Sequence, residues 1–131
     1  DTYLSCKVLK WMMNLALSNN SPELIYAASL VRMRWSEVSL WYNPLDREYL
    51  SYGEEPSFLE SCFFEKTLFH EIGKFDTSYE VRSDFDLFCR FFLKGDLRTV
   101  STSRVIVDYD EKRVYRKEIW KQFKETWEIL Y

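Results

Sequence analysis

The chain has 131 residues, of which 47% are hydrophobic and 18% aromatic, and its Lys+Arg 18 against Asp+Glu 21 leave a net charge of −3. This length suits one domain, residues 1–131, with a core of its own, and so apolar a chain does not stay disordered. The mixed charge excludes a basic nucleic-acid surface, the single His excludes a pair of His metal ligands, and no apolar run approaches the roughly 18 residues of a membrane span.

The first part of the chain predicts a helix, a buried strand and a long connection. Apolar residues recur at helical spacing over residues 5–18, and Ser5 is a candidate N-cap. Residues 24–31 are apolar nearly throughout, which is typical of a strand covered on both faces in an α/β protein. Residues 32–57 are too long for a simple turn and predict an irregular or partly helical connection.

Two shorter elements are expected next. Residues 58–64 are largely apolar and predict a short strand. Residues 65–72 predict one or two helical turns, which Gly73 ends at the C′ position.

The strongest helix signal lies at residues 83–95. Ser83 is a candidate N-cap, Asp86 stands three residues later as in a capping box, and Gly95 ends the helix. The acids lie in the first turn and the basic residues later, as the helix dipole prefers. Arg90 is predicted to form an ion pair with one of these acids.

The last part of the chain completes the predicted fold class, an α/β fold with a mixed sheet and flanking helices. Residues 97–109 alternate enough for one or two strands, and residues 117–131 predict an amphipathic helix. We expect its apolar face to pack on its own sheet, with a partner subunit or a membrane surface as alternatives. This face consists of Ile119, Trp120, Phe123, Trp127 and Leu130.

The cysteines and the single histidine carry no evident chemistry. Cys6, Cys62 and Cys89 lie among large apolar neighbours and include no CxxC pair, which predicts buried free thiols in a reducing compartment. No secretory leader is recognisable, so a cytoplasmic location is expected. His70 is predicted to be a surface residue.

A resemblance to a known family rests on two neighbouring stretches. Residues 63–79 read FFEKTLFHEIGKFDTSY, and residues 83–95 read SDFDLFCRFFLKG. In order and spacing they resemble the second half of the family 2 glycosyltransferases, whose pattern is close to FF+K.LF.EIGGFDESY followed by EDYDL.LRL and a glycine. The resemblance implies a partial GT-A fold: the C-terminal, acceptor-side part, with the nucleotide-binding half expected before residue 1.

The resemblance also implies a reaction and two site residues. Such enzymes transfer a sugar from a nucleotide-sugar donor to an acceptor, here expected to be a glycan or a lipid-linked molecule. Asp84 falls on the position of the general base of inverting members, and Ser83 replaces the acid that usually precedes it, which removes a negative neighbour. Asp1 falls on the last acid of the metal-binding Asp-x-Asp motif, which implies Mg²⁺ or Mn²⁺ on the donor diphosphate.

Three further residues are candidates for the acceptor side. Trp35 and Trp41 present aromatic faces of the kind that stack on sugar rings, with ordinary packing as the alternative. Asp86 is a candidate for an acceptor contact, with the capping role as its alternative.

Two other functions stay open at this point. One is a non-catalytic, aromatic-rich α/β module that binds a partner through Trp35, Trp41 and Trp120. The other is an inactive remnant of a transferase, which the serine at position 83 suggests. An enzyme of this kind is expected in the cytoplasm or at the inner face of a membrane.

Overall fold

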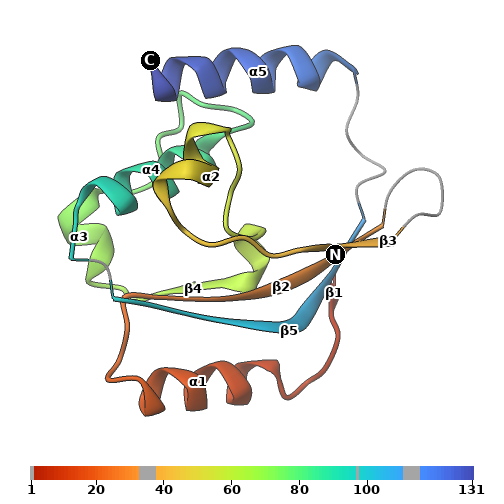
Figure 1. The fold of residues 1–131 in the computed structure, drawn as a ribbon, viewed down its shortest axis with the longest axis vertical. Helices are drawn as coiled ribbons and strands as arrows, with labels where there is room; N and C mark the ends of the chain where they lie inside the picture. The colour runs from red at the N-terminus through yellow and green to blue at the C-terminus, as the bar shows by residue number, and fades with distance from the viewer. Residues whose placement is uncertain (1, 33–37, 97, 111–115) are drawn as a thin grey trace.

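A computed structural model describes residues 2–32, 38–96, 98–110 and 116–131 (Figure 1). Its elements in chain order are β1 (Thr2–Tyr3), α1 (Val8–Ser18), β2 (Leu24–Arg32), β3 (Val38–Trp41), α2 (Arg47–Ser51), the 3₁₀ turn η1 (Leu59–Ser61), β4 (Cys62–Phe64), α3 (Leu68–Ile72), α4 (Ser83–Leu93), β5 (Thr99–Asp110) and α5 (Arg116–Leu130). The described residues form a mixed sheet flanked by helices, which confirms the predicted α/β class.

The sheet is built around β2. Strand β5 pairs with it in parallel, with Ile25 opposite Val100, and β1 pairs antiparallel with β5. Strands β3 and β4 both run antiparallel to the other edge of β2, with β4 against its first residues and β3 against its last. Because β2 has neighbours on both edges, it is the central strand of the described sheet.

Alternation along β2 divides the interior into two cores. Leu24 and Tyr26 pack with Phe85 and Phe88 of α4, whereas Ile25 packs with residues of α1. Helix α1 therefore covers one face of the sheet, and α2, α3 and α4 cover the other (Figure 1). This arrangement confirms the prediction that residues 24–31 form a strand buried on both faces.

Several predicted boundaries shift in the structure. Helix α1 begins at Val8 rather than at residue 5, and the hydroxyl of Ser5 accepts a hydrogen bond from the Lys7 N–H. The connection after β2 contains β3 and α2, whose N-cap Asp46 accepts from the Tyr49 N–H at 3.0 Å. The strand predicted over residues 58–64 is reduced to its last three residues by the preceding 3₁₀ turn.

The predicted capping box of α4 is wrong. Ser83 is the first residue of the helix, and the N-cap position is Arg82, which makes no side-chain cap. The amide groups before α4 are bonded instead by Glu125 of α5, whose carboxylate accepts from the N–H groups of residues 80, 81 and 82 at 2.9–3.0 Å. Asp86 caps nothing and forms an ion pair of 2.9 Å with Arg90, as predicted for Arg90.

The predicted position of the last helix is also wrong. Helix α5 does not lie on the sheet; it lies beyond α2 and α4, because both faces of the sheet are already covered (Figure 1). Ile129 and Leu130, at its end, pack against the core. Most of the expected apolar face is exposed, with Trp120 at 79% and Phe123 at 66%.

The cysteines are less buried than expected. Cys6 is exposed because it lies in the turn before α1, and Cys62 and Cys89 are half-buried; all three are free thiols. Burial raises the pKa of Cys62 well above its ordinary value and that of Cys89 to about 11. His70 is exposed, as predicted. Among the residues that the structure describes, no helix combines the length and hydropathy that crossing a bilayer requires.

Candidate functional site

Asp84 lies in the first turn of α4, where the resemblance places a general base. Its side chain is half-buried, and Oδ1 accepts a hydrogen bond from the Phe85 N–H at 2.8 Å. Amide groups and the helix dipole at this end of α4 favour the ionised carboxylate. Burial acts in the opposite direction and is the larger effect, so the pKa of Asp84 is raised.

A second carboxyl group, that of Glu55, is only 6% exposed. Besides burial, the negative charge of Asp84 acts on it and raises the pKa of Glu55. The Nη1 atom of Arg82 lies 3.0 Å from Glu55 Oε1, and both side chains of this ion pair are 8% exposed. We refer to Glu55, Asp84 and Arg82 as the carboxyl–arginine cluster.

The backbone of Glu55 is fixed by the residues that end β3. The indole Nε1 of Trp41 and the amide Nδ2 of Asn43 both donate to the Glu55 carbonyl, at 3.2 and 3.0 Å. The ring of Trp41 also packs on Phe58, with centroids 5.2 Å apart. Trp41 is half-buried and positions the Glu55 backbone, while its contact with a sugar ring stays a prediction.

A buried serine ties the same segment to the central strand. The hydroxyl of Ser57 donates to the carbonyl of Ala27 at 2.7 Å, beside the irregular pairing of β2 with β5. Ser57 is fully buried. The loop that carries Glu55 is therefore bonded on one side to the end of β3 and on the other to β2.

Arg82 connects the carboxyl pair to the molecular surface. Its Nη2 donates to the Gly53 carbonyl at 2.6 Å, and its guanidinium carbon lies 4.3 Å from the centre of the Phe85 ring. Its Nε is buried and has no hydrogen-bond partner. Backbone hydrogen bonds from residues 80–82 to Glu125 hold the base of this side chain.

The protonation states follow from burial and from charge. Burial raises the pKa of Glu55 to about 8; the charge of Asp84 acts in the same direction, and Arg82 opposes it. Burial also raises the pKa of Asp84, against the Phe85 amide and Arg82. Glu55, Asp84 and Arg82 therefore titrate as one coupled cluster.

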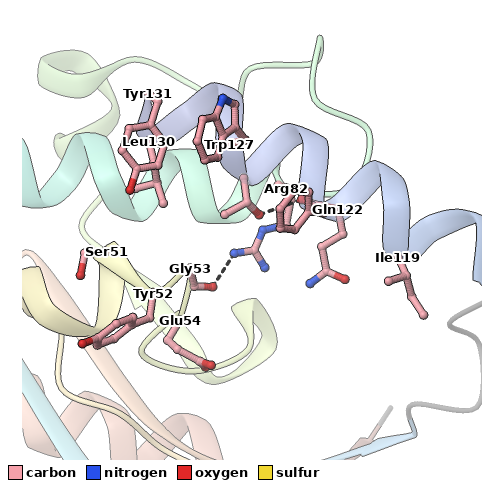
Figure 2. Close-up of a pocket in the computed structure, with 12 residues that line it drawn as sticks. Ser51, Tyr52, Gly53, Glu54, Arg82, Ile119, Gln122, Trp127, Leu130 and Tyr131 are labelled. Atoms are coloured by element: carbon pink, nitrogen blue, oxygen red, sulfur yellow. Dashed lines mark hydrogen bonds between the residues drawn. The ribbon is translucent and has the colours of Figure 1, made fainter.

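A groove of about 480 Å³ adjoins the cluster at Arg82 (Figure 2). One wall is the loop that follows α2, and the other is α5. Figure 2 shows Arg82 reaching between these walls toward Gly53, with Trp127 and Tyr131 on the α5 side. Its lining residues are Ser51, Tyr52, Gly53, Glu54, Arg82, Ile119, Gln122, Phe123, Thr126, Trp127, Leu130 and Tyr131.

The groove combines aromatic rings with hydrogen-bonding groups. The rings of Trp127 and Tyr131 stand 4.5 Å apart at 35°, and both are largely exposed. Gln122, Glu54 and Arg82 supply polar groups along the same walls. An aromatic surface with a few directed polar groups is typical of a binding site for a small polar molecule such as a sugar.

The other predicted site residues do not join this cluster. Asp86 pairs with Arg90, whose Nη1 and Nη2 donate to the carbonyls of Ile72 and Lys74 at 2.6 and 2.8 Å. This arrangement fixes α3 to α4, and an acceptor contact of Asp86 stays a prediction. Trp35 lies outside the described residues.

A metal site is not tested by the structure. Asp1, its predicted ligand, lies outside the described residues. Within the described ranges, no three His, Cys, Asp or Glu side chains gather as a metal site would require. The Mg²⁺ or Mn²⁺ that the resemblance implies stays a prediction.

Sequence reasoning missed Glu55 and Arg82. Glu55 lies in the stretch Gly53-Glu54-Glu55-Pro56, which resembles an ordinary exposed turn. One signal was present: Arg82 directly precedes the motif that contains Asp84, and a half-buried acid needs a cation nearby.

Comparison of the chain with protein-family models, with curated proteins and with solved structures found no match.

Proposed function

We propose that the chain is the acceptor-side part of an inverting glycosyltransferase in which Asp84 is the general base. The observation that carries the proposal is the place of Asp84: a half-buried carboxyl group in the first turn of α4, whose Oδ1 accepts the Phe85 N–H at 2.8 Å and whose pKa is raised by burial. A carboxylate whose pKa is raised toward neutral accepts a proton more readily than an exposed one. The resemblance at residues 63–95 supplies the reaction class.

The proposed reaction is a single displacement. Asp84 takes the proton of an acceptor hydroxyl as its oxygen forms a bond to the anomeric carbon of the donor. The bond from that carbon to the diphosphate breaks, the nucleoside diphosphate leaves with the electron pair, and the configuration inverts. A divalent cation would neutralise the leaving group, and none of the steps assigned to this chain depends on it.

The groove beside Arg82 supports a glycan acceptor. Aromatic faces such as that of Trp127 fit the apolar face of a hexose, and Gln122 and Glu54 offer hydrogen bonds to its hydroxyl groups. Arg82 lies both in the groove and in the carboxyl–arginine cluster. A sugar bound in this groove would therefore lie next to the residue that contacts Glu55.

The second candidate is a partner-binding module. The exposed apolar face of α5 favours it, because Trp120 is 79% exposed and such aromatic residues are common anchors in interfaces. This function needs no catalytic use of Asp84.

One comparison separates the two functions. In the complete gene product, transfer is measured with a panel of nucleotide sugars and glycan acceptors, together with donor binding. Asp84→Asn should lower kcat by roughly 10²–10⁴-fold and leave donor binding intact. The matched control is Asp96→Asn, at an exposed residue beyond α4, which should leave both unchanged. Full turnover in Asp84→Asn would exclude the base assignment, and a wild type without transfer would favour the binding module.

A further inference from the structure

We propose that α1 docks the protein on a membrane surface that contains anionic phospholipid. The contact is made by what we call the outer face of α1, an apolar row with lysines beside it: Leu9, Met13, Leu17, Lys7 and Lys10. This function goes beyond sugar transfer and does not depend on it.

Helix α1 is apolar on two opposite sides. Its sequence, VLKWMMNLALS, is apolar apart from one lysine, one asparagine and one serine. Val8 and Met12 face the sheet and are buried. Leu9, Met13 and Leu17 point away from the sheet and are 62–71% exposed. A helix that is apolar all round is normally covered all round, so the outer side of α1 is expected to be a contact surface.

The exposed apolar residues of α1 form one row. Leu9, Met13 and Leu17 recur at every fourth position, and side chains at this spacing are neighbours along a helix. Lys10 and Asn14 form the adjacent row in the same way, and both are exposed. Figure 1 shows α1 on the outside of the molecule, on the side of the sheet opposite α2, α3 and α4. No element that the structure describes covers the two rows.

The charge around α1 is positive only. Residues 2–22 contain Lys7 and Lys10 and no Asp or Glu, and both lysines are exposed. A third cation stands beside α1, because the guanidinium carbon of Arg104 lies 3.3 Å from the centre of the Trp11 ring. Phosphate and carboxylate groups of anionic phospholipids attract such clusters of cations. The outer face of α1 is therefore complementary in charge to an anionic bilayer.

A lipid surface fits this arrangement of side chains. An amphipathic helix lies in the plane of the bilayer with its apolar row at the boundary of the acyl chains, and its lysine side chains extend to the phosphate groups. A fluid surface needs no cavity that matches the helix. Because the apolar row is short, binding should be reversible and should depend on the lysines.

The exposed apolar face of α5 lacks this selection by charge. Glu118 and Glu128 accompany Lys121 and Lys124 there, so the two signs offset each other. Helices α1 and α5 also lie on opposite sides of the sheet (Figure 1). A bilayer against α1 would therefore leave the groove beside Arg82 open to water.

The first test measures binding of the complete gene product to large unilamellar vesicles by co-sedimentation. We expect binding to phosphatidylcholine vesicles with about 30% phosphatidylserine, and binding at least about tenfold weaker to phosphatidylcholine alone. High salt should release the protein, because it screens the lysines. Equal binding to the two kinds of vesicle, or binding to neither, would overturn the proposal.

Two pairs of substitutions separate the apolar row from the lysines. Leu9→Gln with Met13→Gln should weaken binding by about tenfold or more, because the row no longer gains from leaving water. Lys7→Gln with Lys10→Gln should weaken binding to the phosphatidylserine vesicles by a similar factor and leave binding to phosphatidylcholine unchanged. Undiminished binding in either double variant would contradict the assignment of this face.

The matched controls are Leu93→Gln in α4 and Lys124→Gln in α5. They make the same changes at exposed residues away from α1 and should bind vesicles like the wild type. Sedimentation without lipid tests a second copy of the chain as the alternative occupant. A dimer that Leu9→Gln with Met13→Gln converts to monomers would assign the face to self-association and exclude the lipid surface.

The last test locates the contact on the protein. Cys6 is exposed directly before α1, unlike the half-buried Cys62 and Cys89, so its thiol can carry a polarity-sensitive fluorophore. The emission should shift to shorter wavelength on the phosphatidylserine vesicles. The same label at Ser51→Cys in a Cys6→Ser background, on the opposite side of the sheet, should not shift. Vesicle binding without a shift at Cys6 would place the contact elsewhere and overturn the proposal, whether or not the protein transfers sugar.

Discussion

The carboxylate of Glu125 accepts the backbone N–H of Arg82 at 2.9 Å, so that α5 holds the residue which directly precedes α4. Two further amide groups, those of residues 80 and 81, donate to the same carboxylate. A helix on the outside of the molecule thereby fixes the base of the arginine that contacts Glu55. The geometry of the carboxyl–arginine cluster depends on α5, although α5 contributes no atom to it.

Glu125→Ala should destabilise the fold. Three buried or half-buried amide groups lose an ionised acceptor, so we expect the free energy of unfolding to fall by about 2–4 kcal/mol, measured by urea denaturation. The control is Glu128→Ala, whose 3.7 Å contact with Lys124 lies at the surface and is worth about 0–0.5 kcal/mol. Equal losses in the two variants would contradict the role of Glu125.

The same variant should change the stability at low pH. Burial alone would raise the pKa of Glu125, but its three backbone hydrogen bonds outweigh burial and hold the pKa below the ordinary value of 4.5. Its stabilisation is therefore complete above pH 4.5 and is lost as the pH falls through the lowered value. Glu125→Ala should lack this part of the acid-induced loss in denaturation experiments between pH 7 and 3.

Glu55 should act in the opposite sense. The fold raises the pKa of Glu55 from 4.5 to about 8. Its contribution to the stability of the fold is therefore complete below pH 4.5 and is lost as the pH rises through 8. Glu55→Gln cannot ionise, so its stability relative to the wild type should improve by roughly 2–5 kcal/mol between pH 5 and pH 9. The check is urea denaturation across that range, with Glu48→Gln as the control. Parallel curves for Glu55→Gln and wild type would contradict a buried titrating acid.

Gly53→Ala tests the packing of the groove. Gly53 has φ +77°, and a Cβ at this position would stand 3.1 Å from Cγ2 of Thr126. We expect a loss of about 1–3 kcal/mol in the free energy of unfolding from backbone strain and crowding together. Gly95→Ala is a matched control, because its φ is +73° and no atom lies within 4 Å of the added Cβ.

The difference between the two glycine variants reports the contact with α5. The loss should be larger at Gly53, and adding Thr126→Ser, which removes the crowding methyl group, should abolish the difference. Equal losses that Thr126→Ser leaves unchanged would show that α5 does not approach the loop at this distance.

Trp127→Ala tests the groove as an acceptor site. Loss of a stacking surface should raise KM for the glycan acceptor by about 3- to 10-fold, equivalent to roughly 0.5–1.5 kcal/mol, with kcat nearly unchanged. Steady-state kinetics in the complete gene product measures both constants. Tyr3→Phe is the control: Tyr3 lies in β1, outside the groove, and the change removes only the hydrogen bond from its hydroxyl to the Glu60 carbonyl. A fall in kcat at constant KM would place Trp127 outside the acceptor site.

Local sequence patterns predicted the helices and strands whose burial follows a simple repeat along the chain. Strand β2 is apolar on both sides because two cores meet on it, and α4 repeats Phe85, Phe88 and Phe91 on one buried face. Such periodicity is visible in the sequence because each element needs only its own residues to show it. Asp84 was singled out differently, by the resemblance of one short stretch to a family motif, and its catalytic role stays a prediction.

Contacts between distant segments were not visible in the same patterns. The amide groups before α4 are bonded by Glu125, more than 40 residues later, so Ser83 is not needed as a cap. Glu55 reaches Arg82 from a distant segment whose loop is fixed by Trp41 and Asn43. The amphipathic pattern of α5 shows an apolar face but not the surface against which that face lies.

The parallel pairing of β2 with β5 has a consequence for how the chain folds. Leu24 lies opposite Thr99, so the two strands that join both cores are separated by 75 positions in the chain. Closing so long a loop costs entropy before any strand contact compensates it, which slows folding relative to a helical bundle. During synthesis, the edge of β2 that pairs with β5 stays unpaired until β5 has been made, whereas its other edge pairs with the nearer strands β3 and β4.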